Sequence, residues 1–98
     1  MAKKITWTET SVIDRFRIYQ FWLDHNKSDS YSEKLEKLFN ESAKLISLYP
    51  EIGIKTDFPE IHVKLIRNYK LFYRNKPDAI EIIRVWDTRQ NPDNLGIV

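Results

Sequence analysis

A polar stretch follows the last apolar run of this 98-residue chain. Residues 85–95 read VWDTRQNPDNL, so Trp86, Asp87 and Arg89 stand directly after a run of apolar residues. Asp87 and Arg89 can pair with each other at a strand end, where an exposed ion pair adds little to stability. Trp86 can pack in a core or offer its ring for stacking. The chemistry of this stretch therefore depends on which other residues the fold brings beside it.

Basic residues are concentrated in a second stretch. Residues 61–76 read IHVKLIRNYKLFYRNK and contain no Asp or Glu. Because alternate side chains of a strand share a face, some of these bases are predicted to lie on the sheet face that points away from the helices. The candidates are His62, Lys64, Lys70, Arg74 and Arg84, with Trp86 as a stacking ring. Such a face suits RNA or another anion, because Lys and Arg stabilise phosphate charge and His moves protons. The alternative, which residue types alone favour, is an ordinary solvated strand face.

The sequence gives little support to metal or phosphate-loop chemistry. His25 and His62 lie far apart and neither belongs to a spaced ligand motif. Gly53 and Gly96 are the only glycines, too few for a phosphate-binding loop. The chain has no cysteine, which excludes a disulfide framework and a thiolate zinc site. We predict that the protein uses no metal and no cofactor.

Length and composition predict one small domain over residues 1–98. With 42% hydrophobic residues, the chain can build one core but not two. The N-terminal residues MAKKITWTET are not followed by the apolar run of a signal peptide, and no run is long enough to span a membrane. A net charge of +2 is too small to imply a polyanion partner by itself. We predict a cytoplasmic protein without membrane association.

A strand and a helix open the chain. Residues 3–8 are rich in β-forming side chains and predict a first strand. Thr8 or Thr10 can cap the helix that follows. The apolar stripe predicted for this helix consists of Val12, Phe16, Tyr19 and Leu23. Asp14 falls outside that stripe and is expected on a solvated face.

A second helix is predicted to begin at Ser30. Ser30 and Glu33 have the spacing of a capping box, and Pro50 ends the pattern. Its predicted apolar stripe is Tyr31, Leu35, Leu38, Ser42, Leu45 and Tyr49, widened by Phe39 and Ile46. The link between the helices, HNKSDS, is short and polar, so the two helices should form an antiparallel hairpin.

Three strand-like runs complete the chain, at residues 61–67, 69–75 and 79–87. Asn68 separates the first two and Lys76-Pro77-Asp78 the last two, and both links are typical of tight turns. On the first run Ile61, Val63 and Leu65 alternate with His62 and Lys64, which predicts one apolar and one basic face. The predicted fold is α+β in the order β-α-α-β-β-β, a helical hairpin packed on a mostly antiparallel four-stranded sheet.

Four segments of the chain resemble the RelE/ParE superfamily of bacterial type II toxins, also described as plasmid-stabilisation proteins. They are ITWTETSVIDRFRIYQFW, the corner LYPEIG, the strand pair VKLIRNYKLFYRN and the closing run IEIIRVWDTRQNP. Together they cover nearly the whole chain in the order of the family. The corner and the VWDTR ending are more similar to the ParE-like branch.

The resemblance implies a toxin that a cognate antitoxin neutralises in a hetero-oligomer. The antitoxin's flexible C-terminal segment would order as it binds, using the helical hairpin and the open sheet edges. A ParE-like toxin inhibits DNA gyrase and thereby replication, and is not an enzyme. The alternative is a RelE-like endonuclease, which cuts mRNA in the ribosome without a metal.

The resemblance also assigns site residues. For a RelE-like nuclease the catalytic residues would be Lys70, Arg67 and Arg89, around the scissile phosphate. For a ParE-like toxin the target-binding residues would be Trp86, Asp87, Arg89, Arg84 and Lys64. RelE-like nucleases place a Tyr or His near the C-terminus for proton transfer, whereas this chain has neither after Arg89. That difference favours the gyrase inhibitor.

Overall fold

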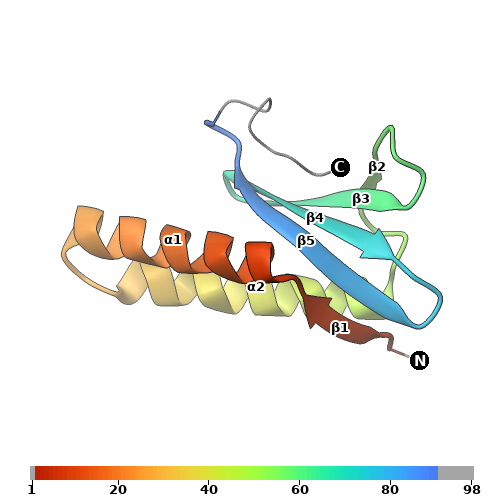
Figure 1. Cartoon of the computed structure of the whole chain (residues 1–98). Coiled ribbons are helices and arrows are strands. Elements are labelled where there is room, and N and C mark those ends of the chain that lie inside the picture. The colour runs from red at the N-terminus through yellow and green to blue at the C-terminus, as the bar shows by residue number, and fades with distance from the viewer. Residues whose placement is uncertain (1, 91–98) are drawn as a thin grey trace.

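A computed structural model of the chain describes residues 2–90. Two helices lie side by side as a hairpin and cover one face of a twisted sheet (Figure 1). The elements are β1 (Lys4–Trp7), α1 (Glu9–Asn26), α2 (Ser30–Leu48), β2 (Ile54–Lys55), β3 (Ile61–Ile66), β4 (Tyr69–Asn75) and β5 (Ala79–Asp87). The α+β class and the order of its main elements are confirmed. In the part of the chain that the structure describes, no helix has the length and apolar character needed to cross a membrane.

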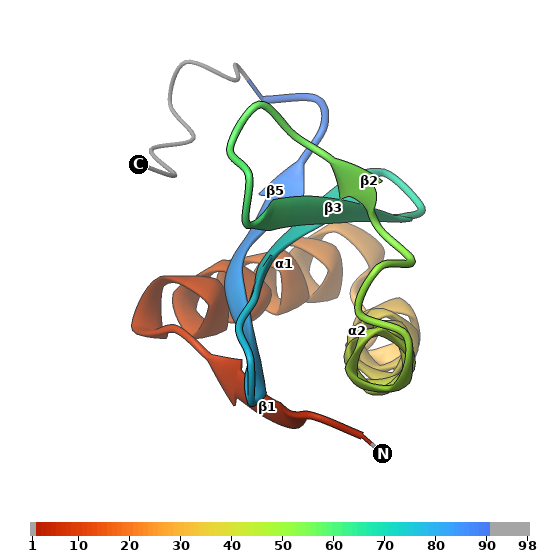
Figure 2. The same cartoon turned by 90° about the vertical axis from the view of Figure 1, so that its right-hand side faces the viewer.

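The sheet has five strands in the order β1-β5-β4-β3-β2 (Figure 2). The three last strands form the expected antiparallel meander, and β1 runs parallel to β5. The strand missing from the prediction is β2, in which only Ile54 and Lys55 pair, opposite Val63 and His62. Two residues are too few for a visible alternation of apolar and polar side chains, so the segment reads as a loop in the sequence.

Helix α1 begins where predicted but buries a different face. The Thr8 hydroxyl accepts a hydrogen bond from Ser11 N at 3.1 Å, which confirms Thr8 as the N-cap. The predicted apolar stripe is wrong, because Val12 is 53% exposed and Phe16 is 63% exposed. The buried side chains of the helix are instead polar, Ser11 and Asp14. Small Ser11 lets the helix approach the sheet closely, and Asp14 has a specific partner there.

Helix α2 begins at Ser30 as predicted, but its capping box does not form. The N-cap is Asp29, which makes no side-chain capping bond. Glu33 instead accepts a hydrogen bond from the Tyr19 hydroxyl at 2.7 Å, which raises the pKa of Tyr19 to about 12. The helix packs on the sheet through Leu35, Phe39, Ala43 and Ile46. Leu45 and Tyr49, the end of the predicted stripe, are exposed.

The two faces of the sheet have separate apolar clusters. The larger one lies between helices and sheet and contains Tyr69, Leu71 and Tyr73 of β4. The smaller one, on the other face, contains Ile61, Val63, Phe72 and Trp86. The alternation in β3 is therefore real, but its predicted basic face is wrong: His62 is buried on the helix side, where its ring stacks on Tyr73.

Candidate functional site

Helix α1 contacts the end of β5 that carries the predicted target-binding residues. Arg84 donates two hydrogen bonds to Asp14, at 2.8 Å from Nε and 3.0 Å from Nη2. Asp14 also accepts a hydrogen bond from Val85 N at 3.0 Å, and it is only 8% exposed. The hydrogen bonds from Arg84 to Asp14 raise the pKa of Arg84, so this cation stays charged. Arg84 therefore has a structural role, as the pair joins helix to strand.

Trp86 is a packing residue in this structure. It is 6% exposed and belongs to the smaller apolar cluster on the face away from the helices. The Arg84 guanidinium lies 5.4 Å from the centre of the Trp86 ring, within the range of a cation–π contact. The Trp86 ring is thus largely covered by other side chains of the chain itself.

Asp87 and Arg89 form an exposed clamp at the end of β5. Arg89 donates from Nε and Nη2 to the two carboxylate oxygens, at 2.9 and 2.7 Å, and its backbone N donates to the same carboxylate at 2.9 Å. The guanidinium also lies 6.0 Å from the Phe21 ring centre and 5.8 Å from that of Trp22, so it faces α1. Hydrogen bonds from Arg89 lower the pKa of Asp87.

This clamp gives a testable pH dependence. Because the folded pKa of Asp87 is lowered, the clamp contributes stability above the unfolded pKa, near 3.8, and loses it as pH falls through the folded value. We expect Arg89→Ala to raise the pKa of Asp87 toward 3.8, measured by carboxyl NMR titration. The control is Arg17→Ala, which removes another guanidinium of the same crevice that does not hydrogen-bond to Asp87, and this change should leave the pKa of Asp87 in place. An unchanged pKa in Arg89→Ala would contradict the clamp.

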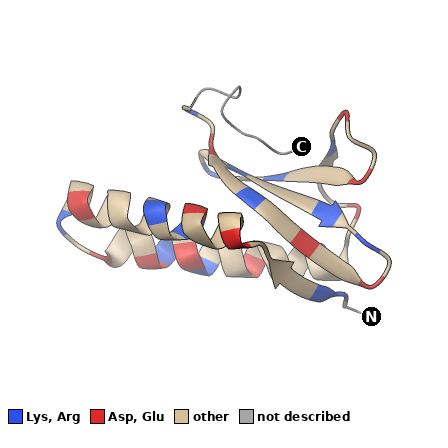
Figure 3. Cartoon of the chain, viewed as in Figure 1, with Lys and Arg blue, Asp and Glu red and all other residues tan. Residues whose placement is uncertain are grey.

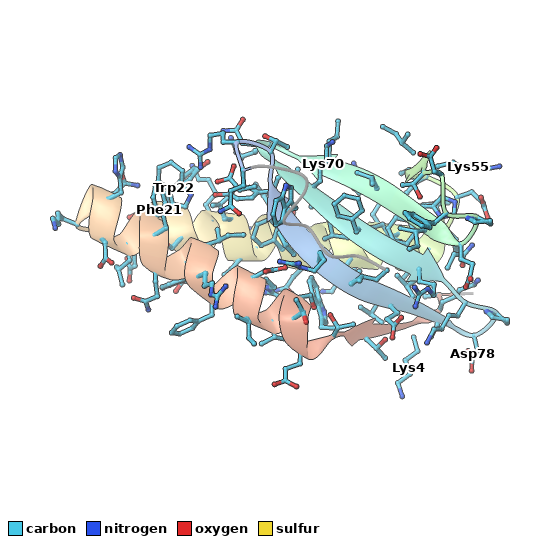
Figure 4. All side chains as sticks on the ribbon, turned by 45° about the horizontal axis from the view of Figure 1, so that its top comes forward. Lys4, Phe21, Trp22, Lys55, Lys70 and Asp78 are labelled. Carbon is cyan, nitrogen blue, oxygen red and sulfur yellow. The ribbon has the colours of Figure 1, made fainter. Side chains whose placement is uncertain are left out.

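A crevice separates α1 from the end of β5. Its volume is about 300 Å³. Side chains of both elements line it, among them Asp14, Arg17, Phe21, Arg84, Trp86 and Asp87. Figure 4 shows Phe21 and Trp22 on the α1 side of this region. Four of the five predicted target-binding residues thus lie in or beside one crevice.

The remaining predicted residues lie on other surfaces. Lys64 is on the helix-facing side of β3, opposite Leu71, and does not join the crevice. Lys70 is exposed and projects from the other face of the sheet, opposite Trp86 (Figure 4). Arg67 occupies the β3–β4 turn with φ 55, a left-handed conformation that a non-glycine residue adopts at some cost. Strands β3 and β4 carry Lys and Arg without any Asp or Glu (Figure 3).

Two acid-base groups of the described chain, His62 and Tyr69, are buried on the helix side of the sheet. His62 is buried on the helix side, with its nearest carboxylate, Glu51, 3.5 Å from Nε2. Tyr69 accepts a hydrogen bond from Trp22 Nε1 at 2.7 Å, and burial raises its pKa. The C-terminal tail, predicted to lie near the target contact, falls outside the described residues. Within residues 2–90, no three His, Asp or Glu side chains converge as metal ligands.

Sequence reasoning missed the α1 side of the crevice. Asp14, Arg17 and Phe21 contribute to its wall, and none was expected to take part. The available signal was an acid in the second turn of α1, Asp14, of opposite charge to Arg84 in the last strand. The two residues are 70 positions apart, so no local pattern joins them.

Comparisons with known proteins agree with the fold. A family model described as the ParE toxin of the type II toxin-antitoxin system, parDE, matches residues 5–92. A solved structure described as a chromosomal ParDE toxin-antitoxin system from P. aeruginosa superposes with a TM-score of 0.77. It is 16% identical, and the match covers 90% of this chain and 98% of the other. No curated protein sequence matches. The family match spans nearly the whole chain, which therefore belongs to the ParE toxin family of type II toxin-antitoxin systems.

Proposed function

We propose that this toxin inhibits DNA gyrase by binding it and so stops replication, and that a cognate antitoxin neutralises the toxin by binding in turn. The contact surface includes the exposed Asp87–Arg89 clamp at the end of β5. Arg84 and Trp86 support this surface from inside, since both are engaged in the fold. Lys64, on another part of the sheet, is left out of the contact. Such an inhibitor would act in the cytoplasm, where the chromosome lies.

The observation that carries the proposal is the placement of Lys70 and Arg89, two of the three bases that RNA cleavage would need. Arg89 is clamped by Asp87 and faces α1, whereas Lys70 projects from the opposite face of the sheet. Metal-free cleavage needs bases around one phosphate and a group that transfers protons beside them. In the described residues, His62 and Tyr69 are both buried on the helix side. A toxin that inhibits its target only by binding needs neither bases gathered around one phosphate nor a group that transfers protons.

A supercoiling assay tests the proposal. Purified toxin added to gyrase, relaxed plasmid and ATP should block supercoiling or accumulate cleaved DNA. We expect Arg89→Ala to need about tenfold more protein for the same effect, because it removes a charged group from the contact. The matched control is Lys44→Ala on the exposed face of α2, which should match the unmodified toxin. Circular dichroism would verify that both variants are folded.

The proposal fails if toxin that arrests growth leaves gyrase unaffected. In that case primer extension on translated mRNA would show whether cuts appear at the ribosomal A site. Such cuts would identify a ribosome-dependent endonuclease in place of a gyrase inhibitor.

A further inference from the structure

An apolar patch lies on the outer side of α1. It consists of Val12, Ile13 and Phe16, whose side chains are 53, 42 and 63% exposed. Other sides of the helix pack against α2 and β5, and no described element covers the patch (Figure 1). Because residues three and four positions apart are neighbours on a helix, the three side chains form one continuous surface. A continuous apolar surface is typical of a protein contact, whereas single exposed apolar residues are common.

A groove lies beside the patch, between α1 and α2. It has a volume of about 410 Å³ and is lined by Val12, Arg15, Phe16, Tyr19, Gln20 and Glu36. The exposed Phe16 ring therefore stands next to a hollow on the same surface. A projection beside a hollow suits a two-fold contact, because each copy then offers both parts to the other.

The charges in the groove wall are already paired. Arg15 donates from Nε to Glu36 at 2.8 Å, and its guanidinium lies 4.3 Å from the centre of the Trp7 ring. The Tyr19 hydroxyl donates to Glu33 at 2.7 Å. A charged partner would therefore gain no ion pair inside the groove, and an apolar surface such as the patch itself fits it better.

Two free charges flank the patch at equal distances along the helix. Glu9 stands four residues before Ile13 and Arg17 four residues after it, and both are exposed. Neither has an ion-pair partner within residues 2–90. Residues four positions apart form one row along a helix surface. The row of Glu9, Ile13 and Arg17 thus has opposite charges at its two ends and an apolar side chain at its centre.

This row is complementary to itself when its direction is reversed. Two α1 helices that pack antiparallel through these rows, with Ile13 of each copy at the two-fold axis, bring Glu9 of each copy to Arg17 of the other. Phe16 of each copy then lies against Val12 of the other, at the rim of its groove. A second copy of the chain carries the matching pattern by identity, which favours it as the occupant of the patch.

We propose that the free toxin associates as an antiparallel two-fold dimer through the outer side of α1, with Ile13 at the axis. The contact joins the apolar patches at its centre and two Glu9–Arg17 ion pairs at its ends. A contact between two helices of 18 residues is small for a specific interface, so we expect a dissociation constant on the order of 10 to 100 µM. The dimer goes beyond the proposed function and depends on neither gyrase nor the antitoxin.

Sedimentation equilibrium of the full chain tests the apolar centre. Between about 1 and about 500 µM, the average mass should rise from 11.8 kDa toward twice that value. Ile13→Glu should abolish the rise, because it sets two like charges against each other at the axis. The matched control is Leu65→Glu, the same change at an exposed site on β3, which should dimerise like the unmodified chain. A chain that stays monomeric throughout, or equal dimerisation of the two variants, would overturn the proposal.

Exchange of the two charges tests the antiparallel arrangement. We expect Arg17→Glu to weaken self-association about tenfold at low salt, because it creates two like-charge contacts with Glu9 per dimer. Adding Glu9→Arg to this variant should restore the affinity, since the opposite charges meet again. The control is Lys55→Glu, an equal reversal at the far edge of the sheet (Figure 4), which should have no effect. A double variant as weak as Arg17→Glu alone would overturn the arrangement.

Antitoxin titrations separate the two possible occupants of the patch. A free toxin that stays monomeric while Ile13→Glu, but not Leu65→Glu, loses affinity for the antitoxin would assign the patch to the antitoxin and overturn the dimer. Circular dichroism of each variant verifies that a lost contact does not reflect a lost fold. Absence of gyrase inhibition would bear on the proposed function alone, since none of these measurements involves gyrase.

Discussion

Replacing Asp14 with alanine is expected to lower the free energy of unfolding by about 3 kcal/mol, because it removes the carboxylate that binds the largely buried Arg84 guanidinium through two hydrogen bonds. The change also removes the acceptor for Val85 N, a backbone donor that has no other described partner. Chemical denaturation followed by tryptophan fluorescence measures the loss. Both effects act at the junction of α1 and β5, where the crevice begins.

The controls separate the buried pair from a general effect of charge. Asp24→Ala removes an exposed acid from the same helix and should change the free energy of unfolding by less than about 0.5 kcal/mol. Asp14→Asn keeps an acceptor for Val85 N and should fall between the two variants. If Asp14→Ala proves as stable as Asp24→Ala, the Asp14–Arg84 pair does not hold α1 to β5.

The strands were predictable because their signals are local. The bounds of β4 and β5 coincide with the predicted runs, since apolar residues fill both and turn residues separate them. Helix α1 shows the opposite case. Its most apolar stripe, with Val12 and Phe16, is exposed, and its buried face is built on Ser11 and Asp14. Hydrophobic periodicity locates a helix but cannot identify a buried face whose contacts are polar and non-local.

The β5 part of the candidate site was predictable because its residues are neighbours in sequence, whereas the α1 part was not. Arg84, Trp86, Asp87 and Arg89 lie close together in sequence, and the cluster was visible as a polar end to an apolar strand. What the sequence could not supply is the orientation of each side chain. The Trp86 side chain packs in the smaller apolar cluster because Val63 and Phe72 lie on the same face of the sheet. The opposite wall of the crevice comes from α1, at a sequence distance that no motif spans.

The corner between α2 and β2 depends on one buried tyrosine. The Tyr73 hydroxyl donates to the Pro50 carbonyl at 2.7 Å and accepts from Gly53 N at 3.0 Å. Tyr73 is fully buried, and burial raises its pKa, so the hydroxyl stays protonated and able to donate. This hydroxyl fixes the turn of the LYPEIG segment, and thereby the start of the short edge strand β2. The LYPEIG corner, one of the segments that resemble the family, therefore has a structural role.

Gly53→Ala is expected to destabilise the protein by about 2 kcal/mol, because the added carbon has no space. A Cβ at this position would lie 2.6 Å from the Tyr73 Oη, 2.8 Å from its Cε1 and 3.0 Å from the Val63 carbonyl oxygen. Neither the buried ring nor the strand backbone can move away cheaply. The control is the same change in a Tyr73→Phe background, where the hydroxyl contact is gone and the added cost of Gly53→Ala should be smaller. Equal costs in the two backgrounds, measured by urea unfolding, would show that the hydroxyl does not set the corner.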